Sequence, residues 1–235
     1  MNSIKKAIFL IGSPKNKNSS SASLGGYLLK KIEEYEIEVE TVHIHSEIST
    51  EVKTIKFFEK LQESDYIILA APLYVDTLPA KVIKALNLIV KNKDKINNDL
   101  SGSKNAKSLT VIVNCGFPEA EQNKIALRVY EEFAKEADFK YLGGIAVGMG
   151  GAVSGKSLSE MGGMVNDIIQ GLDQAAEDIL KNKKLSTYVI EKTSNPMVSQ
   201  KWLYTLIGDF SWKFQALKNG VYLKMNDRPY LKDDY

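Results

Sequence analysis

Apolar residues are grouped along the chain in short continuous runs, separated by segments in which they recur every three or four positions. The continuous runs predict buried strands at residues 7–11, 66–71, 109–114 and 141–147. The spaced segments predict helices at residues 20–35, 54–63, 80–90 and 122–137, and a long helix that ends at residue 180. This alternation indicates a parallel sheet covered by helices on both faces.

Residues 37–43 have a different pattern, in which apolar and polar residues alternate as in a half-exposed strand. Such a strand belongs at a sheet edge, which favours a five-stranded parallel sheet in the order 2-1-3-4-5. That order places a ligand crevice at the carboxyl ends of strands one and three. His43 and His45 share one side of the edge strand, as in some metal sites. With no other histidine and no nearby cysteine, a solvated edge is favoured and no metal is expected.

The helix after Pro79 is expected to turn an apolar side inward, made of Val82, Ile83, Leu86 and Ile89. Residues 91–107 are polar and are expected to form a surface connection. Residues 187–190 are a candidate short strand.

The pattern changes after Lys184, which predicts one domain over residues 1–184 and a C-terminal helical extension over 185–235. The extension carries an apolar helix that stops at Asn219-Gly220; its apolar positions are Trp202, Leu203, Leu206, Ile207, Phe210, Phe214 and Leu217. Trp212 lies off this stripe, so the helix is apolar on more than one side. We expect it to pack across a homodimer interface, close to the crevice; the alternative is a monomer in which it covers the chain's own sheet edge.

Composition narrows the class of protein. Hydrophobic residues are 44% and charged residues 26% of the 235, with a formal net charge of +2, so no nucleic-acid partner is expected. The single cysteine excludes an internal disulfide and suits a reducing compartment. No apolar run is long enough to span a bilayer or to act as a signal peptide, so we expect a cytoplasmic protein without a membrane partner.

The segment after the first strand is a candidate anion site. It is rich in hydroxyl and amide side chains, and it leads into a helix whose first turn offers unpaired N–H groups. Ser13, Asn18 and the run 19–21 supply donors, and Lys15 supplies a positive charge. The alternative is that the serines only cap a solvated helix end.

Two further loops follow strands at the same edge of the sheet, at residues 72–79 and 114–119. Together with the first loop they indicate one extended ligand. Its anionic end would lie at the first helix, and a flat, partly apolar group would lie between the other two loops.

These loops resemble those of a known family. Gly12-Ser13-Pro14-Lys15 with Ser20 and Ser21 is similar to the phosphate loop of the NAD(P)H-dependent FMN reductase and flavodoxin-like quinone reductase family, and residues 72–79 resemble its loop beside the isoalloxazine ring. The resemblance covers roughly residues 5–180 and implies the flavodoxin-like three-layer sandwich. The chain departs from the family where Lys15 replaces the more frequent arginine and where the serine run is longer. Because Cys115 is the only cysteine, the family's iron–sulfur branch is excluded.

The resemblance implies that the chain binds FMN, takes electrons from NAD(P)H, and passes them to a small acceptor such as a flavin, a quinone, or a nitro- or azo-compound. It assigns cofactor binding to Ser13, Lys15, Asn18, Ser19, Ser20, Ser21, Pro72, Leu73, Tyr74, Val75, Asp76, Asn114, Cys115 and Gly116. Tyr74 would line the ring, and Cys115 is expected to be a buried, inert thiol. No proton-transfer residue is identified. FMN is favoured over FAD because no second glycine fingerprint is present.

Three other functions remain open. The segment from Gly150 to Ser157 fits the form of a nucleotide-binding P-loop, although the later strands of such a protein are missing. A flavodoxin-like electron carrier would bind FMN without a substrate of its own, but the positive net charge and the extension favour an enzyme. A relative that has lost flavin and binds only partners is a third possibility.

Overall fold

The computed structural model describes residues 4–98, 106–198 and 201–228. Five parallel strands form one sheet in the order β2-β1-β3-β4-β5, as the sequence predicted. Their bounds are β1 (Lys6–Ile11), β2 (Glu38–His43), β3 (Tyr66–Pro72), β4 (Ser108–Asn114) and β5 (Lys140–Val147).

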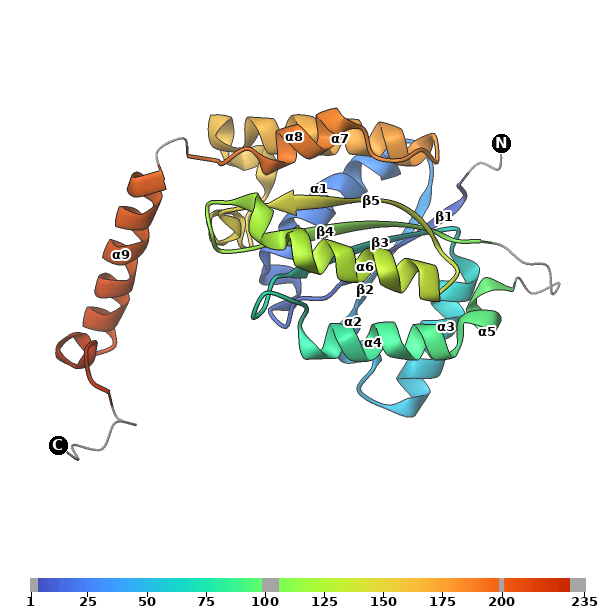
Figure 1. Ribbon diagram of the computed structural model, residues 1–235, viewed down its shortest axis with the longest axis horizontal. Helices are drawn as coiled ribbons and strands as arrows, with labels where there is room; N and C mark the ends of the chain where they lie inside the picture. The colour runs from blue at the N-terminus through green and yellow to red at the C-terminus, as the bar shows by residue number, and fades with distance from the viewer. Residues whose placement is uncertain (1–3, 99–105, 199–200, 229–235) are drawn as a thin grey trace. The chain divides into compact units, whose positions relative to one another are not determined.

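Helices cover both faces of this sheet, which makes three layers (Figure 1). On one side lie α1 (Ser20–Glu33), α7 (Asn166–Leu180) and α8 (Thr187–Ser194). On the other side lie α2 (Ile44–Glu47), α3 (Glu51–Glu63), α4 (Ala80–Lys91), α5 (Lys93–Asn97) and α6 (Lys124–Glu136). The helix α9 (Lys201–Lys218) follows α8 in the chain.

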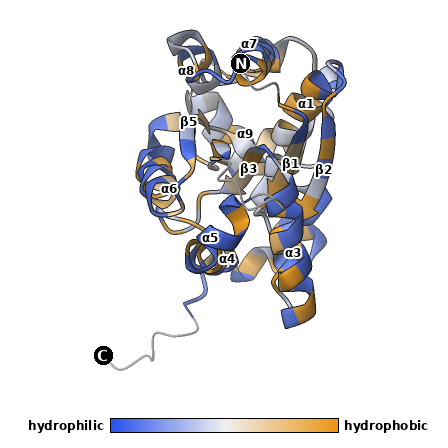
Figure 2. Ribbon diagram, turned by 90° about the vertical axis from the view of Figure 1, so that its right-hand side faces the viewer, coloured by the Kyte–Doolittle hydropathy of each residue, from blue (hydrophilic) through white to orange (hydrophobic). Residues whose placement is uncertain are grey.

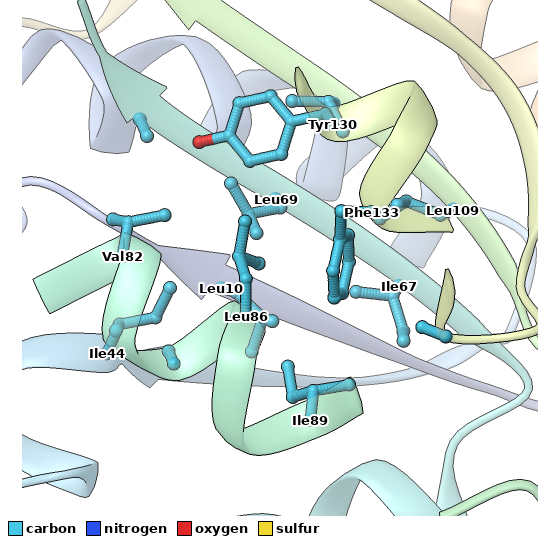
Figure 3. Packing of buried hydrophobic residues seen from close by; sticks show 14 of the residues in the cluster. Leu10, Ile44, Ile67, Leu69, Val82, Leu86, Ile89, Leu109, Tyr130 and Phe133 are labelled. Atoms are coloured by element: carbon cyan, nitrogen blue, oxygen red, sulfur yellow. The ribbon is translucent and has the colours of Figure 1, made fainter. Parts of the chain in front are cut away.

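Each face of the sheet has its own hydrophobic core, because successive strand side chains point to opposite faces. Ile8 and Leu10 of β1 join the core beneath α3, α4 and α6, while Phe9 joins the core beneath α1 and α7. Figure 3 shows the first core, with Tyr130 and Phe133 of α6 facing the strands. Figure 2 shows apolar and polar residues alternating along α1, α3 and α6, as expected of helices with one side against a sheet.

Two details of the predicted helical layer were wrong. Ile83 is 40% exposed, and the inward face of α4 is made by Val82, Ala85, Leu86 and Ile89. The segment 91–107 is not only a surface connection, because it contains α5, which buries Ile96 and Asn97. Asn97 Nδ2 donates a hydrogen bond to Ala137 O (2.8 Å), so this polar residue ties α5 to the end of α6. Residues 99–105 of the segment lie outside the described part of the chain.

The candidate strand at residues 187–190 was also wrong, since this segment is the first half of α8. Val189 and Thr193, four positions apart, are completely buried on one side of this helix. Gly171 of α7 permits the contact, because a Cβ at Gly171 would stand 2.6 Å from Thr193 Cγ2. Asp178 of α7 holds the start of α8, where its Oδ2 accepts a hydrogen bond from Ser186 N (2.9 Å).

The chain divides into two compact units, residues 1–197 and 198–235. The helix α8 lies in the first unit, so this division falls later than the boundary at Lys184 drawn from the sequence. In the second unit, α9 is followed by Gly220 at a φ of +68°, the left-handed conformation that commonly ends a helix. Among the described residues, no helix is long and apolar enough to cross a membrane.

Lys107, one residue before β4, is almost completely buried, with 1% of its surface exposed. Its Nζ donates hydrogen bonds to the carbonyl oxygens of Gln62 (2.9 Å) and Ser64 (2.6 Å). Burial disfavours the charged ammonium and lowers the pKa of Lys107 from 10.5 to about 8.

We expect the pH dependence of stability to report this buried lysine. Between pH 8 and 10.5 the unfolded chain retains a proton on Lys107 that the folded chain has released, so its contribution makes the free energy of unfolding rise with pH. In Lys107→Met that contribution is absent. The wild-type protein should therefore gain roughly 2 kcal/mol relative to the variant as the pH rises through this window. Urea unfolding of both proteins at several pH values measures the difference, and parallel pH profiles would contradict the assignment.

Candidate functional site

The three loops expected to bind a ligand meet at the carboxyl edge of the sheet. Ile11 pairs with Ala70, and Pro72 pairs with Asn114, so the loops after β1, β3 and β4 leave adjacent strands at the same end. Backbone hydrogen bonds continue this pairing into the loops, from Gly12 N to Ala70 O (2.8 Å) and from Leu73 N to Asn114 O (2.8 Å).

The loop after β1 delivers the N-terminus of α1 to this edge. Ser19 is the N-cap, and its Oγ accepts a hydrogen bond from Ala22 N (3.1 Å). The first intrahelical bond runs from Ser23 N to Ser19 O (3.0 Å). The N–H groups of Ser20 and Ser21 precede that bond, so they belong to the unpaired first turn that favours an anion.

The hydroxyls of the serine run have partners within the protein. Ser19 Oγ donates to Asn16 O (2.6 Å), Ser20 Oγ donates to Gly150 O (2.6 Å), and Ser21 Oγ donates to Asn114 Oδ1 (2.8 Å). These bonds tie α1 to the loops after β4 and β5. A hydroxyl has one hydrogen to donate, so these serines offer an anion their backbone N–H groups and not their side chains.

Several donors in this loop have no acceptor among the described residues; they include the Ser13 hydroxyl and the ammonium groups of Lys15 and Lys17. Ser13 is 3% exposed, and its Oγ accepts a hydrogen bond from Lys15 N (3.3 Å), which leaves its hydroxyl hydrogen available. Lys15 is exposed and forms no ion pair with a described carboxylate. Asn18 is held through its backbone, since its carbonyl accepts from Ser154 Oγ (3.2 Å), and its side chain is exposed.

The loop after β3 forms a tight turn. Tyr74 and Thr77 exchange two backbone hydrogen bonds of 3.0 Å, and between them Val75 and Asp76 have positive φ angles of 48° and 56°. Val75 is 95% exposed. A β-branched residue in the left-handed region costs roughly 1–2 kcal/mol, and such strain concentrates at functional sites. Tyr74 is 42% exposed at the base of this turn, so part of its aromatic side chain is accessible to a ligand.

Cys115 is buried, as the sequence predicted, and behaves as a structural thiol. Its Sγ donates toward Phe117 O and Glu119 O (both 3.6 Å), and it accepts from Asn123 Nδ2 (3.5 Å). Burial raises the pKa of the Cys115 thiol, which opposes formation of a nucleophilic thiolate. Gly116, the next residue, is exposed.

The prediction that His43 and His45 share one side of the edge strand was wrong, because β2 ends at His43 and His45 lies in α2. Both side chains are half-buried. His43 pairs with Ile11 and therefore stands beside the loop after β1. Burial, and next the charge of Lys81, lower the pKa of His45, which favours its neutral form. Within the described ranges, no group of three or more His, Cys, Asp or Glu side chains is placed to hold a metal ion.

The P-loop pattern at residues 150–157 does not form the strand–loop–helix of a nucleotide-binding loop. Residues Gly150–Val153 and Leu158–Glu160 form two 3-10 turns, and the next helix, α7, begins only at Asn166. Gly150 instead links two parts of the site. Its carbonyl oxygen accepts a hydrogen bond from Ser20 Oγ, and its N–H donates to Cys115 O (2.8 Å). A Cβ at Gly150 would lie 2.9 Å from Asn114 Nδ2, so only glycine fits there.

The carboxyl edge therefore brings together the N-terminus of α1 and a turn that contains Tyr74. Sequence analysis named the loops that meet here, but it missed the supporting role of Gly150. The glycine pattern was the available signal for that role, and it was interpreted as a rival nucleotide site.

Comparisons with known proteins agree with this architecture. The model of a family described as having a flavodoxin-like fold matches residues 5–157. Among solved structures, an NADH:FMN oxidoreductase in its apo form is 14% identical with a TM-score of 0.55, and covers 85% of this chain and 98% of its own. An NADPH-quinone reductase from P. pentosaceus is 19% identical with a TM-score of 0.50, and covers 76% of this chain and 98% of its own. At these identities the likeness concerns the fold. No curated protein compared with the chain matches it.

Proposed function

The chain belongs to the family with the flavodoxin-like fold, and from that premise we propose that it is an FMN-dependent oxidoreductase. It would take electrons from NAD(P)H and pass them to a small acceptor, of the flavin, quinone, nitro- or azo-compound class. The oxidoreductases among the structurally similar proteins are consistent with this proposal.

One observation supports this proposal. Hydrogen-bond donors without an acceptor in the protein and an exposed aromatic residue lie at the same edge of the sheet. The Ser13 hydroxyl, the Lys15 ammonium and the first-turn N–H groups of α1 match a phosphate in charge and in hydrogen-bonding capacity. Tyr74 and the strained turn that it begins match a flat ring system. FMN has a phosphate at one end and such a ring at the other.

The residues of the chain would bind and orient this cofactor, which when bound supplies hydride and electron transfer. Lys15 contributes a point charge and not the bidentate contact of an arginine. The ties from Ser20 to Gly150 and from Ser21 to Asn114 fix α1 against two other loops, so the phosphate end and the ring end are held at a set separation.

The decisive experiment is a flavin titration of the purified protein, followed by release and chromatography of any bound flavin. We expect FMN to bind, and Ser13→Ala to weaken FMN about 10–100-fold by removing a charge-assisted hydrogen bond of roughly 1.5–3 kcal/mol. Riboflavin lacks the phosphate, so its affinity for the variant should scarcely change.

Ser21→Ala is the matched comparison, because it removes a hydroxyl that is committed to Asn114. It should weaken FMN and riboflavin by similar factors, through loss of the tie between the loops. If Ser13→Ala also weakens both ligands equally, its hydroxyl does not meet a phosphate. Recovery of FAD, or no flavin uptake under added FMN, would reject the cofactor.

An electron carrier with the same fold remains the second candidate. Steady-state oxidation of NADH and NADPH by the FMN-loaded protein, with a soluble quinone as acceptor, separates the two. Turnover supports the enzyme, whereas tight FMN binding without oxidation of either nucleotide supports the carrier.

A further inference from the structure

A polar hollow lies between the outer side of α1 and the segment 155–159, next to the loop after β1, which contributes Lys17 to its lining. Its volume is about 230 Å³, and it is lined by three lysines, Lys17, Lys30 and Lys156, and by three serines, Ser23, Ser157 and Ser159. Lys156 is the lysine of the P-loop pattern, and in the structure it lines this hollow.

The walls of the hollow are fixed by contacts on both sides. Ser154 Oγ donates to Asn18 O (3.2 Å), and Gly155 takes a φ of +68° where it crosses Asn18. Leu158 is 1% exposed and anchors the segment in the core beneath α1. A side chain at Gly155 would be strained by this backbone conformation, so the glycine suits the close crossing.

Tyr27 forms part of the opposite wall. Its Oη donates to Asp173 Oδ1 of α7 (2.9 Å), which fixes the ring. Burial, and next that hydrogen bond, raise the pKa of Tyr27 to about 12, so the hydroxyl is protonated at neutral pH. The Asp173 carboxylate is occupied by this contact and is not among the residues that line the hollow.

No carboxylate is among the residues that line the hollow. None of its three lysines forms an ion pair with a carboxylate of the described residues. Lys31, on the same helix but outside the hollow, has the ordinary arrangement of a surface lysine, with its Nζ 3.1 Å from Glu34 Oε1. Three lysines line one hollow that has no carboxylate among its lining residues, and such a positively charged surface favours an anion.

We propose that this hollow binds a phosphate monoester dianion. The lysine ammonium groups supply positive charge, and the serine hydroxyls supply neutral hydrogen-bond donors to the phosphate oxygens. The volume is below the roughly 300–1,000 Å³ of pockets that enclose drug-sized ligands, so it suits a phosphate with part of its sugar. Two sources have this chemistry: the 2′-phosphate of a nicotinamide dinucleotide, and free inorganic phosphate. The hollow shares Lys17 with the loop at residues 12–21, and its other lining residues belong to α1 and the segment 155–159. The proposal does not depend on flavin binding.

Isothermal titration calorimetry with 2′-AMP, 5′-AMP and inorganic phosphate tests the proposal, in the presence and absence of saturating FMN. We expect binding of a phosphate in both conditions. Lys156→Gln and Lys30→Gln should each weaken it about ten-fold, and Lys156→Arg should restore most of the affinity. Lys31→Gln removes one positive charge from α1 outside the hollow and is the matched control, which should change the affinity less than two-fold.

The probes separate the two sources and the two sites. Tighter binding of 2′-AMP than of 5′-AMP or phosphate supports a dinucleotide, and equal binding of phosphate supports a free anion. FMN abolishes phosphate binding if the phosphate occupies the loop after β1. In that case Ser13→Ala weakens the binding and Lys156→Gln does not, and this result overturns the proposal. So does the absence of binding by all three probes. If no flavin binds, the lysine variants still decide the question, so failure of the proposed function is distinguishable.

Discussion

Replacing Gly25 by alanine should destabilise the protein by about 2–3 kcal/mol, whereas replacing its neighbour Gly26 should stabilise it by about 0.5–1 kcal/mol. A Cβ at Gly25 would stand 2.1 Å from Cζ of Phe9, a ring that is 1% exposed in β1. A Cβ at Gly26 meets nothing within 4 Å. Both positions are inside α1, so both substitutions gain the same helix propensity, and the difference between them isolates the contact with Phe9.

The consequence reaches the candidate site, because the first turn of α1 is the one proposed to bind the phosphate. If the helix moves away from Phe9 to admit a methyl group, Ser20 and Ser21 move with it and their bonds to Gly150 and Asn114 lengthen. We therefore expect Gly25→Ala to lose affinity for FMN as well as stability. Urea unfolding and a flavin titration of the two variants measure both effects.

A second change tests the cause. Phe9→Leu shortens the side chain beneath α1, so the double variant Gly25→Ala/Phe9→Leu should be more stable than the sum of the two single changes predicts. Strict additivity, or equal stability of Gly25→Ala and Gly26→Ala, would mean that the helix does not rest on Phe9 as described.

The strands were predictable because a parallel sheet buried on both faces demands continuous apolar runs. The edge strand was predictable for the converse reason, since its alternating residues could not be buried on two sides. Where the sequence analysis failed, the local pattern was too short. The pattern of residues 187–190 fits a strand as well as a helix. The helix is favoured only when α7 is in place, because Val189 and Thr193 are then buried together and Thr193 packs against Gly171.

The candidate site was predictable as a set of loops but not as a set of donors. The fold order brings the carboxyl ends of β1, β3 and β4 together, and that order followed from the sequence. The partners of the serine hydroxyls did not follow, because Ser20 bonds a carbonyl 130 residues away and Ser21 an amide 93 residues away. Sequence alone therefore treated Ser13, Ser20 and Ser21 as equivalent, whereas the structure leaves only the Ser13 hydroxyl available.

The second large effect concerns α9. Its apolar side chains recur every three or four positions along one stripe and are all more than half exposed: Trp202, Leu206, Phe210, Phe214 and Leu217. A contiguous, exposed apolar stripe of this kind marks an interaction surface. Gln215 lies on the opposite side, and so does Trp212, which is 72% exposed, so the helix is apolar on more than one side. Lys213 pairs with Asp209 (2.7 Å) along the helix.

A second copy of the chain is the partner we expect. A single stripe on one helix is self-complementary in a two-fold dimer, where each residue of the stripe meets its symmetry mate or a neighbour of it. Packing two such helices buries the aromatic side chains of both stripes and leaves the opposite sides in water. The first unit, residues 1–197, holds both cores of the sheet, so it should fold without α9.

Ending the chain after Met197 should therefore convert a dimer into a folded, FMN-binding monomer, as measured by light scattering and flavin titration. Phe210→Glu in the full chain tests the stripe without a truncation. A carboxylate buried in the interface costs several kcal/mol, so the Kd of the dimer should rise at least 100-fold. Gln215→Glu adds the same charge on the side of α9 away from the stripe and should leave the dimer intact.

A full chain that is monomeric, or a dimer that survives Phe210→Glu, would exclude this interface. If the monomeric full chain binds anionic lipid vesicles and the truncated chain does not, the stripe serves a membrane surface instead, because aromatic residues and lysines on one helix also suit that boundary.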